Sequence, residues 1–204
     1  MKKIMFNDRF GLTSAVLEGR KTMTRRLMKV PILRLNDVNY ALKDSANLNA
    51  NKAAIIKKYA AYVVGEEVAV AQSYKDIFEE AMNGDYWSDI YERFRQADVD
   101  DKKGWDNKMF VNAELMPHRI KITDIMLECI QDISDEDIMR EGIMEGEFMN
   151  TWDRYYFDVW GDVANHITFN RPRDAYRELI DRISGKGTWQ SNPWVYVYTF
   201  ELIR

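Results

Sequence analysis

Residues 194–203, WVYVYTFELI, are the stretch that decides the class of fold. They are rich in Val, Tyr, Phe and Thr, and apolar side chains occupy both odd and even positions. This pattern predicts a central strand that is buried on both faces. Further strands are expected at residues 3–6, at 68–71 after a turn at 64–67, and from Arg119 onward. Because helical segments are interspersed with these strands without a regular βαβ alternation, the sequence predicts an α+β fold.

The long strand that follows the polar loop contains a change of phase. Ile120 and Ile122 point to one face, whereas beyond Asp124 the apolar positions move to Ile125 and Leu127. A slip of one residue is typical of a bulge or a bend in a strongly curved sheet. The sheet is therefore expected to be curved.

Apolar residues at helical spacing mark several further segments. The first expected helix begins at a cap formed by Asn7 or Asp8 and runs to Glu18, where Gly19 stops it. Residues 31–52 are expected to be irregular. The spacing predicts later helices at residues 56–63, 74–81, 87–94 and 176–183.

One short helix has a well-specified start. Ser134 is a typical N-cap, Asp137 follows three residues later, and Ile133 and Ile138 are spaced as a hydrophobic staple. Gly142 then ends the helix.

Composition bounds the class of protein. The chain has 204 residues, of which 46% are apolar, enough for a core of normal size. Cys129 is the one cysteine, so neither an intramolecular disulfide nor a multi-thiolate metal site can form. With only His118 and His166 besides, a zinc site would depend on carboxylates, and no metal or cofactor is expected.

Charge and hydropathy patterning restrict the partners and the compartment. No apolar stretch has the ~7–15 residues of a secretory h-region or the ~20 of a membrane span. A cytoplasmic protein without membrane contact is therefore expected. The net charge of −4 means that any contact with nucleic acid has to come from a local basic patch.

Residues 17–26, LEGRKTMTRR, form such a patch. After Gly19, four cations and two hydroxyls follow within seven residues: Arg20, Lys21, Thr22, Thr24, Arg25 and Arg26. Arginines can hold a phosphate or a carbonyl edge, and crowding by cations lowers the pKa of a lysine toward that of a base. The alternative is a solvated loop whose cations pair with some of the 33 acidic residues.

Other candidates have weaker local signals. Glu141, at the end of the capped helix, can supply a carboxylate, although such glutamates are often simply solvated. Trp189 and Trp194 bracket residues 190–193, which include Asn192, and can either stack on a base or pack in the core. His118 is expected to be structural or superficial.

Five segments together resemble the ASCH-domain proteins, a small β-barrel family related to the PUA RNA-binding fold. They are residues 17–26, 64–68 (VGEEV), 130–143 (IQDISDEDIMREGI), 185–189 (GKGTW) and 192–195 (NPWV). Their order along the chain is that of the larger bacterial and phage members of the family.

The resemblance implies a curved, mixed PUA/ASCH-like β-barrel with peripheral helices. Residues 1–204 would form one domain, with insertions near 31–62, 74–108 and 144–170. A cleft beside the basic segment would receive RNA or a nucleotide-like molecule. The expected ligand-binding residues are Arg20, Thr22, Arg25, Arg26, Trp189 and Asn192.

One enzymatically active branch of the family removes the acyl group from N4-acetylcytidine. Its lysine, threonine and glutamate match Lys21, Thr24 and Glu141. By this likeness Thr24 attacks the amide carbonyl, Lys21 takes its proton, and Glu141 orients or relays. Other relatives cleave RNA.

The chain departs from the family in one motif and in size. Residues 70–73, VAQS, stand where many relatives carry Trp-x-Arg-Glu, so an arginine and a carboxylate are missing. The chain is also longer than the compact amidohydrolases. The function expected first is therefore binding of RNA or a nucleotide-like molecule. The alternatives are, second, hydrolysis of an acylated nucleoside or of RNA and, third, a protein-interaction scaffold that docks a partner on residues 74–97. No oligomeric state is predicted.

Overall fold

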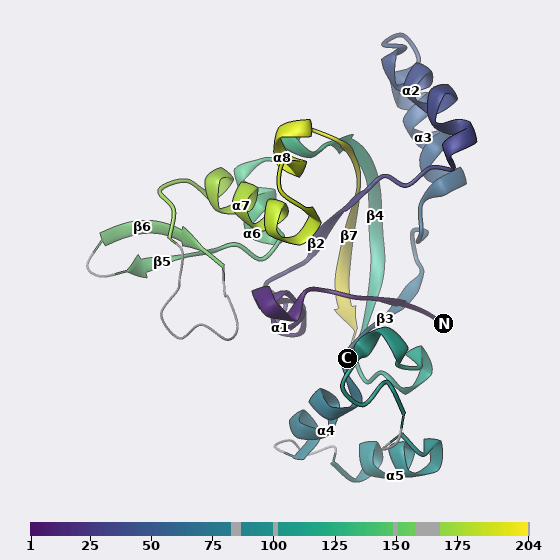
Figure 1. Ribbon diagram of the computed structural model, residues 1–204, viewed down its shortest axis with the longest axis vertical. Coiled ribbons are helices and arrows are strands. Elements are labelled where there is room, and N and C mark those ends of the chain that lie inside the picture. The colour runs from purple at the N-terminus through teal and green to yellow at the C-terminus, as the bar shows by residue number, and fades with distance from the viewer. Residues whose placement is uncertain (83–86, 100–101, 149–150, 158–167, 204) are drawn as a thin grey trace.

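A five-stranded mixed sheet forms the centre of the molecule in the computed structural model, which describes residues 1–82, 87–99, 102–148, 151–157 and 168–203 (Figure 1). The strands, in spatial order, are β1 (Lys2–Ile4), β3 (Glu67–Val70), β4 (Arg119–Cys129), β7 (Trp194–Ile203) and β2 (Met23–Leu27). β1 runs parallel to β3, and the other neighbours are antiparallel. The predicted α+β class is confirmed.

The last strand, β7, occupies the predicted central position. It pairs with β4 on one side and with β2 on the other. Its consecutive residues 195–198 are all buried, so both faces of the strand are covered, as its apolar pattern predicted. The register of β4 with β7 shifts between Ile122 and Asp124, where the sequence predicted a bulge. Figure 1 shows that β4 and β7 run side by side along the length of the sheet.

The two edges of the sheet are linked by side chains. Arg26 on β2 donates a hydrogen bond of 2.6 Å from Nη2 to the carbonyl of Met5, just after β1. Phe6 packs on Phe200 of β7 with 5.8 Å between ring centroids. Among the described residues no backbone pairing joins β1 to β2, so the strands do not form a closed barrel.

Helices and a hairpin surround this sheet. The helices are α1 (Leu12–Leu17), α2 (Leu35–Lys43), α3 (Leu48–Tyr59), α4 (Tyr74–Met82), α5 (Trp87–Ala97), α6 (Asp135–Arg140), α7 (Pro172–Ser184) and α8 (Thr188–Ser191). The hairpin consists of β5 (Met144–Phe148) and β6 (Thr151–Tyr156). In Figure 1, α6, α7 and α8 lie together on one side of the sheet, and the hairpin projects from that side.

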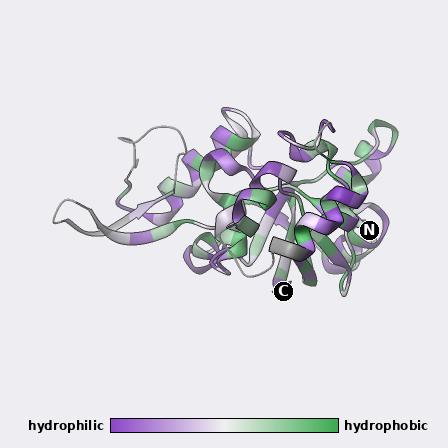
Figure 2. Ribbon diagram, turned by 90° about the horizontal axis from the view of Figure 1, so that it is seen from below, coloured by the Kyte–Doolittle hydropathy of each residue, from purple (hydrophilic) through white to green (hydrophobic). Residues whose placement is uncertain are grey.

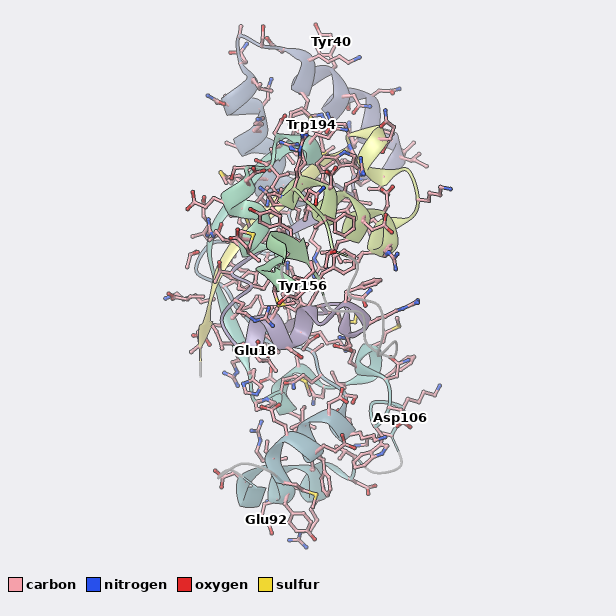
Figure 3. The ribbon with its side chains drawn as sticks, turned by 90° about the vertical axis from the view of Figure 1, so that its left-hand side faces the viewer. Glu18, Tyr40, Glu92, Asp106, Tyr156 and Trp194 are labelled. Atoms are coloured by element: carbon pink, nitrogen blue, oxygen red, sulfur yellow. The ribbon has the colours of Figure 1, made fainter. Side chains whose placement is uncertain are left out.

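The molecule is elongated, and its apolar residues form two clusters. Tyr40 on α2 and Glu92 on α5 mark the two ends in Figure 3. The larger cluster joins the sheet to α1, α2, α3, α6 and α7, and the smaller one lies around α4 and α5. In Figure 2 the central strands are largely hydrophobic, whereas the surrounding helices mix both kinds of residue. None of the described helices combines the length and the apolar character needed to span a membrane.

Two expectations near the N-terminus are wrong. The first helix does not begin at Asn7 or Asp8, because Gly11 adopts a left-handed conformation (φ 62°) and separates a short 3₁₀ turn from α1. Residues 31–52 are not irregular, since they form a 3₁₀ turn, α2 and the first part of α3. Only Val38, Leu42 and Ile55 of these two helices are buried, so the apolar pattern is too sparse to recognise.

Other predicted elements are confirmed with small changes. The helix expected at 56–63 ends at Tyr59, because Ala60 is extended. The helices at 74–81, 87–94 and 176–183 correspond to α4, α5 and α7. His166, and Gly84 in the segment between the first two of these helices, lie outside the described residues.

Candidate functional site

Lys21 lies at the junction of α1 and β2 and is buried. Gly19 turns the chain (φ 76°), and the Lys21 amide then donates to the carbonyl of Ala15 at 2.8 Å. This bond directs the side chain inward, where only 2% of the residue is exposed. Its Nζ lies 2.6 Å from Glu141 Oε2 and 2.7 Å from the Glu141 carbonyl oxygen. The ammonium therefore also satisfies a carbonyl at the C-terminus of α6.

The structure of α6 brings Glu141 to this point. The Ser134 hydroxyl accepts a hydrogen bond from the Asp137 amide at 3.1 Å, which confirms the predicted cap. Gly142 follows Glu141 with φ at 100°, and a Cβ there would lie 3.3 Å from Leu12 and 3.7 Å from the Lys21 side chain. A glycine at this position thus allows the end of α6 to approach both α1 and Lys21.

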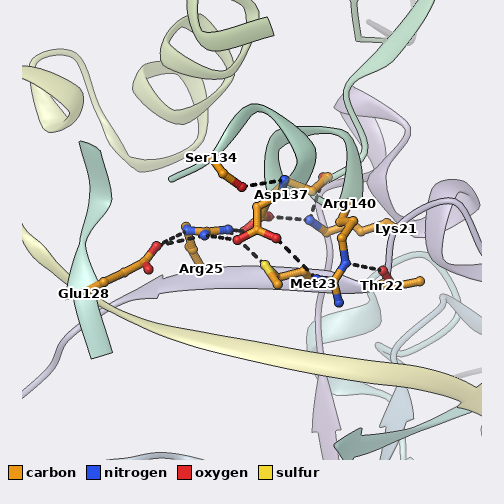
Figure 4. A network of polar contacts seen from close by, with 9 residues as sticks. Lys21, Thr22, Met23, Arg25, Glu128, Ser134, Asp137 and Arg140 are labelled. Carbon is orange, nitrogen blue, oxygen red and sulfur yellow. Dashed lines mark hydrogen bonds and ion pairs between the residues drawn. The ribbon is translucent and has the colours of Figure 1, made fainter. Parts of the chain in front are cut away.

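Arg25 connects β2 to three carboxylates (Figure 4). Its guanidinium lies 2.8 Å from Glu128 on β4, 3.0 Å from Asp137 on α6 and 3.2 Å from Glu141. Its side chain has no exposed surface. Burial lowers the pKa of Arg25, but the Glu141 and Glu128 carboxylates outweigh this effect and hold it above its ordinary value. Arg25 is therefore a fixed cation that joins the sheet to α6.

Thr24 precedes Arg25 on β2 and lines a cavity that Lys21, Arg25 and Glu141 also line. It is buried and pairs with Tyr198 of β7. The cavity has a volume of about 290 Å³, at the lower end of the range for small-molecule sites. Its polar lining includes Lys21, Thr24, Arg25, Arg26 and Glu141, and α1 and α7 contribute Leu12, Tyr176, Leu179, Ile180 and Ile183 to its apolar lining.

The protonation of Lys21 is set by opposing effects. Burial lowers its pKa, and the nearby Arg26 and Arg25 cations act in the same direction. The charge of Glu141 and its hydrogen bond raise it, but the net result is a pKa below the ordinary value of a lysine. This direction is the one that a lysine needs in order to act as a base.

Tyr176 contributes a buried hydroxyl to the wall of the cavity. Burial, reinforced by the Glu141 charge, raises the pKa of Tyr176 well above its ordinary value, so the hydroxyl keeps its proton. Its oxygen has no hydrogen-bond partner among the described residues. A ligand in the cavity that accepts a hydrogen bond would satisfy this group.

The structure places four of the predicted ligand-binding residues outside this cavity. Arg20 is exposed and pairs with Glu18 at 2.7 Å. Thr22 Oγ1 accepts a hydrogen bond of 3.3 Å from Arg140, and its backbone bonds to α6 and to β7.

Trp189 and Asn192 hold the segment between α7 and β7. The Trp189 ring is buried edge-on against Tyr176, with 6.1 Å between centroids. Asn192 has a left-handed conformation (φ 45°), and its Oδ1 accepts a bond of 2.9 Å from the Gln131 amide. Packing therefore explains the position of Trp189, and turn geometry explains that of Asn192. Arg25 and Arg26 are the predicted ligand-binding residues that line the cavity.

Sequence reasoning missed three residues of this site: Glu128, Asp137 and Tyr176. A basic segment that is buried requires carboxylates nearby, but the sequence does not say which of the 33 acidic residues supply them. Asp137 had a local signal as part of the α6 cap, and Tyr176 as part of the apolar face of α7. Neither signal pointed to Arg25 or to a cavity.

His118 and the other potential metal ligands lie elsewhere. His118 Nε2 is 3.0 Å from Glu80, near the start of β4. Within the described ranges, His, Cys, Asp and Glu side chains nowhere gather in threes in a geometry suited to a metal ion.

Comparison of the chain with protein-family models, with curated proteins and with solved structures finds no match in any of the three. The contacts of the site and the sequence resemblance are therefore the basis for proposing a function.

Proposed function

We propose that the cavity beside Lys21 is the active site of a small amidohydrolase that removes the acyl group from an N4-acylated, cytidine-like nucleoside. The observation that carries this proposal is the 2.6 Å contact between Lys21 Nζ and Glu141 Oε2, in a cavity that Thr24 also lines. A hydroxyl nucleophile, an amine with a lowered pKa and a carboxylate that orients it are the groups that amide hydrolysis requires.

In the proposed reaction, neutral Lys21 removes the proton of Thr24 Oγ1 while this oxygen attacks the amide carbonyl carbon. The C–N bond then breaks, the proton passes from Lys21 to the departing N4 nitrogen, and the acyl group remains on Thr24 as an ester. Water, deprotonated by Lys21, hydrolyses the ester, which releases a carboxylic acid and restores the hydroxyl. Glu141 holds Lys21 in place and tunes its pKa.

The pairing of the cations favours this function over a basic surface for RNA. Lys21 is neutralised by Glu141, and Arg25 by three carboxylates, while Arg20 pairs with Glu18 outside the cavity. Phosphate binding by a patch depends on cations that are free to face the anion. A small ligand of low charge suits a cavity in which most of the cations are already compensated.

Binding without turnover is the second candidate. Arg26 favours it, because this residue lines the cavity and takes part in none of the ion pairs of the described residues. A scaffold function has less support: of the large apolar side chains described in residues 74–97, Met82 and Tyr91 are exposed, whereas Ile77, Ile90 and Phe94 are buried.

We further propose that the sheet is an incomplete barrel of the PUA/ASCH kind. Two observations support this proposal. The bulge in β4 is a device that bends a sheet, and the bond from Arg26 to the Met5 carbonyl links the β2 edge to the chain just after β1, the two edges that a closed barrel would join. In this arrangement the cavity lies at the edge of β2, between the sheet and α7.

A panel of N4-acylated cytidines tests the activity. Lys21→Met should lower kcat/KM by ~10²–10⁴-fold, the usual contribution of an acid–base group. Thr24→Val, which removes the proposed nucleophile, should lower it at least as far. Lys43→Met is the matched control, because Lys43 is exposed at the end of α2 and touches neither the cavity nor its walls. Circular dichroism and thermal melting check that the variants are folded.

Two results would contradict the proposal. One is the absence of turnover of every acylated cytidine by the wild-type protein. The other is turnover that persists at the wild-type rate in folded Lys21→Met.

A further inference from the structure

A second cavity adjoins the first. It has a volume of about 340 Å³ and shares Arg26, Leu27 and Ser184 with the first cavity. Its remaining wall comes from Lys29, from Tyr59 and the segment that follows α3, and from β7. The α2–α3 segment, which the sequence placed among the insertions, therefore supplies part of this wall.

Four tyrosines give the second cavity its character: Tyr59, Tyr62, Tyr196 and Tyr198. Tyr62 and Tyr198 pack edge to face, with 5.3 Å between ring centroids, and Tyr196 lies 6.2 Å from Tyr198. Contacts with the backbone fix two of the rings, since Tyr198 accepts from the Ala61 amide and Tyr62 donates to the Lys3 carbonyl, both at 3.0 Å. Fixed aromatic walls of this kind suit a planar ring, and each stacked base contributes ~1–3 kcal/mol.

Two polar atoms in these walls have no hydrogen-bond partner among the described residues. They are the hydroxyl oxygen of Tyr196 and Nε of Arg26, and both are buried. An unsatisfied buried donor destabilises a fold by ~1–3 kcal/mol, so a ligand that accepts from it gains binding energy. The Tyr196 hydroxyl hydrogen can rotate to meet such an acceptor.

Arg26 lies in the wall that the two cavities share, and its charge is uncompensated. The other three cations of the basic segment each have a carboxylate within 3.2 Å or less, whereas Arg26 bonds to the Met5 carbonyl and lies over the Phe6 ring. A partly buried cation without a counter-ion favours the binding of an anion, and a guanidinium is well suited to phosphate.

We propose that the second cavity binds a planar ring that is joined through a phosphate at Arg26 to the nucleoside in the first cavity. The acylated nucleoside of the proposed reaction can then be one residue of a dinucleotide-like ligand that carries a single phosphate. This inference rests on the proposed function of the first cavity. It assigns the tyrosine-lined cavity to the neighbouring base and Arg26 to the linking phosphate.

Calorimetric titration of the full chain with unacylated, non-reacting probes tests this inference. The probes are cytidine, cytidine 3′-monophosphate, cytidine 5′-monophosphate and the dinucleotides of cytidine with adenosine in both orders. The monophosphate of the correct polarity should bind more tightly than cytidine, and the corresponding dinucleotide at least ~10-fold more tightly, as stacking of one base implies.

Variants assign the gain to its source. Tyr59→Ala and Tyr196→Phe should lower the affinity for the dinucleotide and leave the affinity for cytidine unchanged. Arg26→Gln should abolish the increase in affinity that the phosphate gives. Tyr40→Ala is the control, since Tyr40 is a highly exposed tyrosine of α2 outside both cavities.

The wild-type ligand series decides the question even if a variant fails to fold. If cytidine binds and acylated cytidine is turned over in a Lys21-dependent manner, but neither dinucleotide binds more tightly than cytidine, the inference is wrong and the proposed function stands. If no probe binds and no acylated cytidine is hydrolysed, both are wrong.

Discussion

At the scale of single residues, Lys21 is held between two opposing influences. Burial lowers its pKa by removing the ammonium from water, and Glu141 raises it by attraction. The position of Lys21 therefore depends on the same carboxylate that, by raising its pKa, limits the fraction of Lys21 that is neutral. The charges of Arg26 and Arg25, on β2, also lower this pKa and so favour deprotonation.

The pH profile of catalysis follows from this balance. Because the proposed reaction uses Lys21 in its neutral form, kcat/KM should rise with pH and level off above the Lys21 pKa, below the ordinary value for lysine. Glu141→Gln removes the charge that raises this pKa, so the midpoint of the rising limb should move to lower pH while the maximal rate falls. A midpoint that stays in place or moves to higher pH would count against Lys21 as the base.

The same pKa shift has a consequence for folding. The unfolded chain binds the Lys21 proton more tightly than the folded one, so stability should increase as pH rises between the folded pKa and the ordinary value. Lys21→Met should lack this increase. The free energy of unfolding of wild type minus that of Lys21→Met, measured by urea denaturation at several pH values, isolates this contribution. The value should increase with pH, and a value that is constant or decreases with pH contradicts the expectation.

Arg25 provides the corresponding test for the ion cluster. Arg25→Met leaves the Glu128, Asp137 and Glu141 carboxylates crowded and without their cation, and should lower the free energy of unfolding by ~3–5 kcal/mol. Arg20→Met removes an exposed pair with Glu18 and should change stability by only ~0–1 kcal/mol. Equal effects of both variants in urea denaturation would show that the buried cluster has no special role.

At the scale of elements, the site is a contact between the end of α6 and the start of β2. Backbone bonds tie the two, since the Thr22 amide donates to the Arg140 carbonyl at 3.0 Å. Gly142 is the residue that permits this approach, because a side chain there would press on Leu12 and Lys21.

Alanine at Gly142 therefore has two effects. The positive φ costs ~1–2 kcal/mol for any residue with a Cβ, and the added methyl group displaces α1 or Lys21. Gly185→Ala is the matched control, because Gly185 has a similar φ of 107° but nothing within 4 Å of a Cβ. Both variants should lower the melting temperature, and only Gly142→Ala should also lower kcat. If both variants lost activity, the close approach of Gly142 to Leu12 and Lys21 would not be the reason for the effect on catalysis.

Elements with local signals were predictable, and contacts between distant elements were not. The Ser134 cap and the apolar stripe of α7 are encoded within a few residues, so α6 and α7 were found where the sequence placed them. Lys21 and Glu141 were brought together only through the family resemblance. The pairing of Arg25 with Glu128 has no local pattern, since it depends on how β2 and β4 flank β7.

At the scale of the whole molecule, the distribution of charge favours a site for a small ligand over a surface that attracts polyanions. The chain carries a net charge of −4, and most cations near the cavity are paired with carboxylates. Long-range attraction of nucleic acid by a broad basic surface is therefore not expected, and affinity has to come from the cavities themselves.

Salt dependence tests this view. Raising the salt from 50 to 200 mM should leave the KM for an uncharged acylated cytidine nearly unchanged. For a dinucleotide, one phosphate contact at Arg26 corresponds to a slope of about −0.7 in a plot of log affinity against log salt. A steep decline for the uncharged nucleoside, or a slope near that of several phosphate contacts for the dinucleotide, would indicate that a larger basic surface takes part.

The antiparallel pairing of β2 with β7 places Thr24 opposite Tyr198, with almost the entire described chain between them. During synthesis, Thr24, the proposed nucleophile, emerges from the ribosome long before the strand that will hold it. A nascent or truncated polypeptide thus lacks an organised centre, however well its early helices have formed. Recovery of turnover after dilution from denaturant should accordingly be among the last signals to return, which makes catalysis itself a reporter of completed assembly.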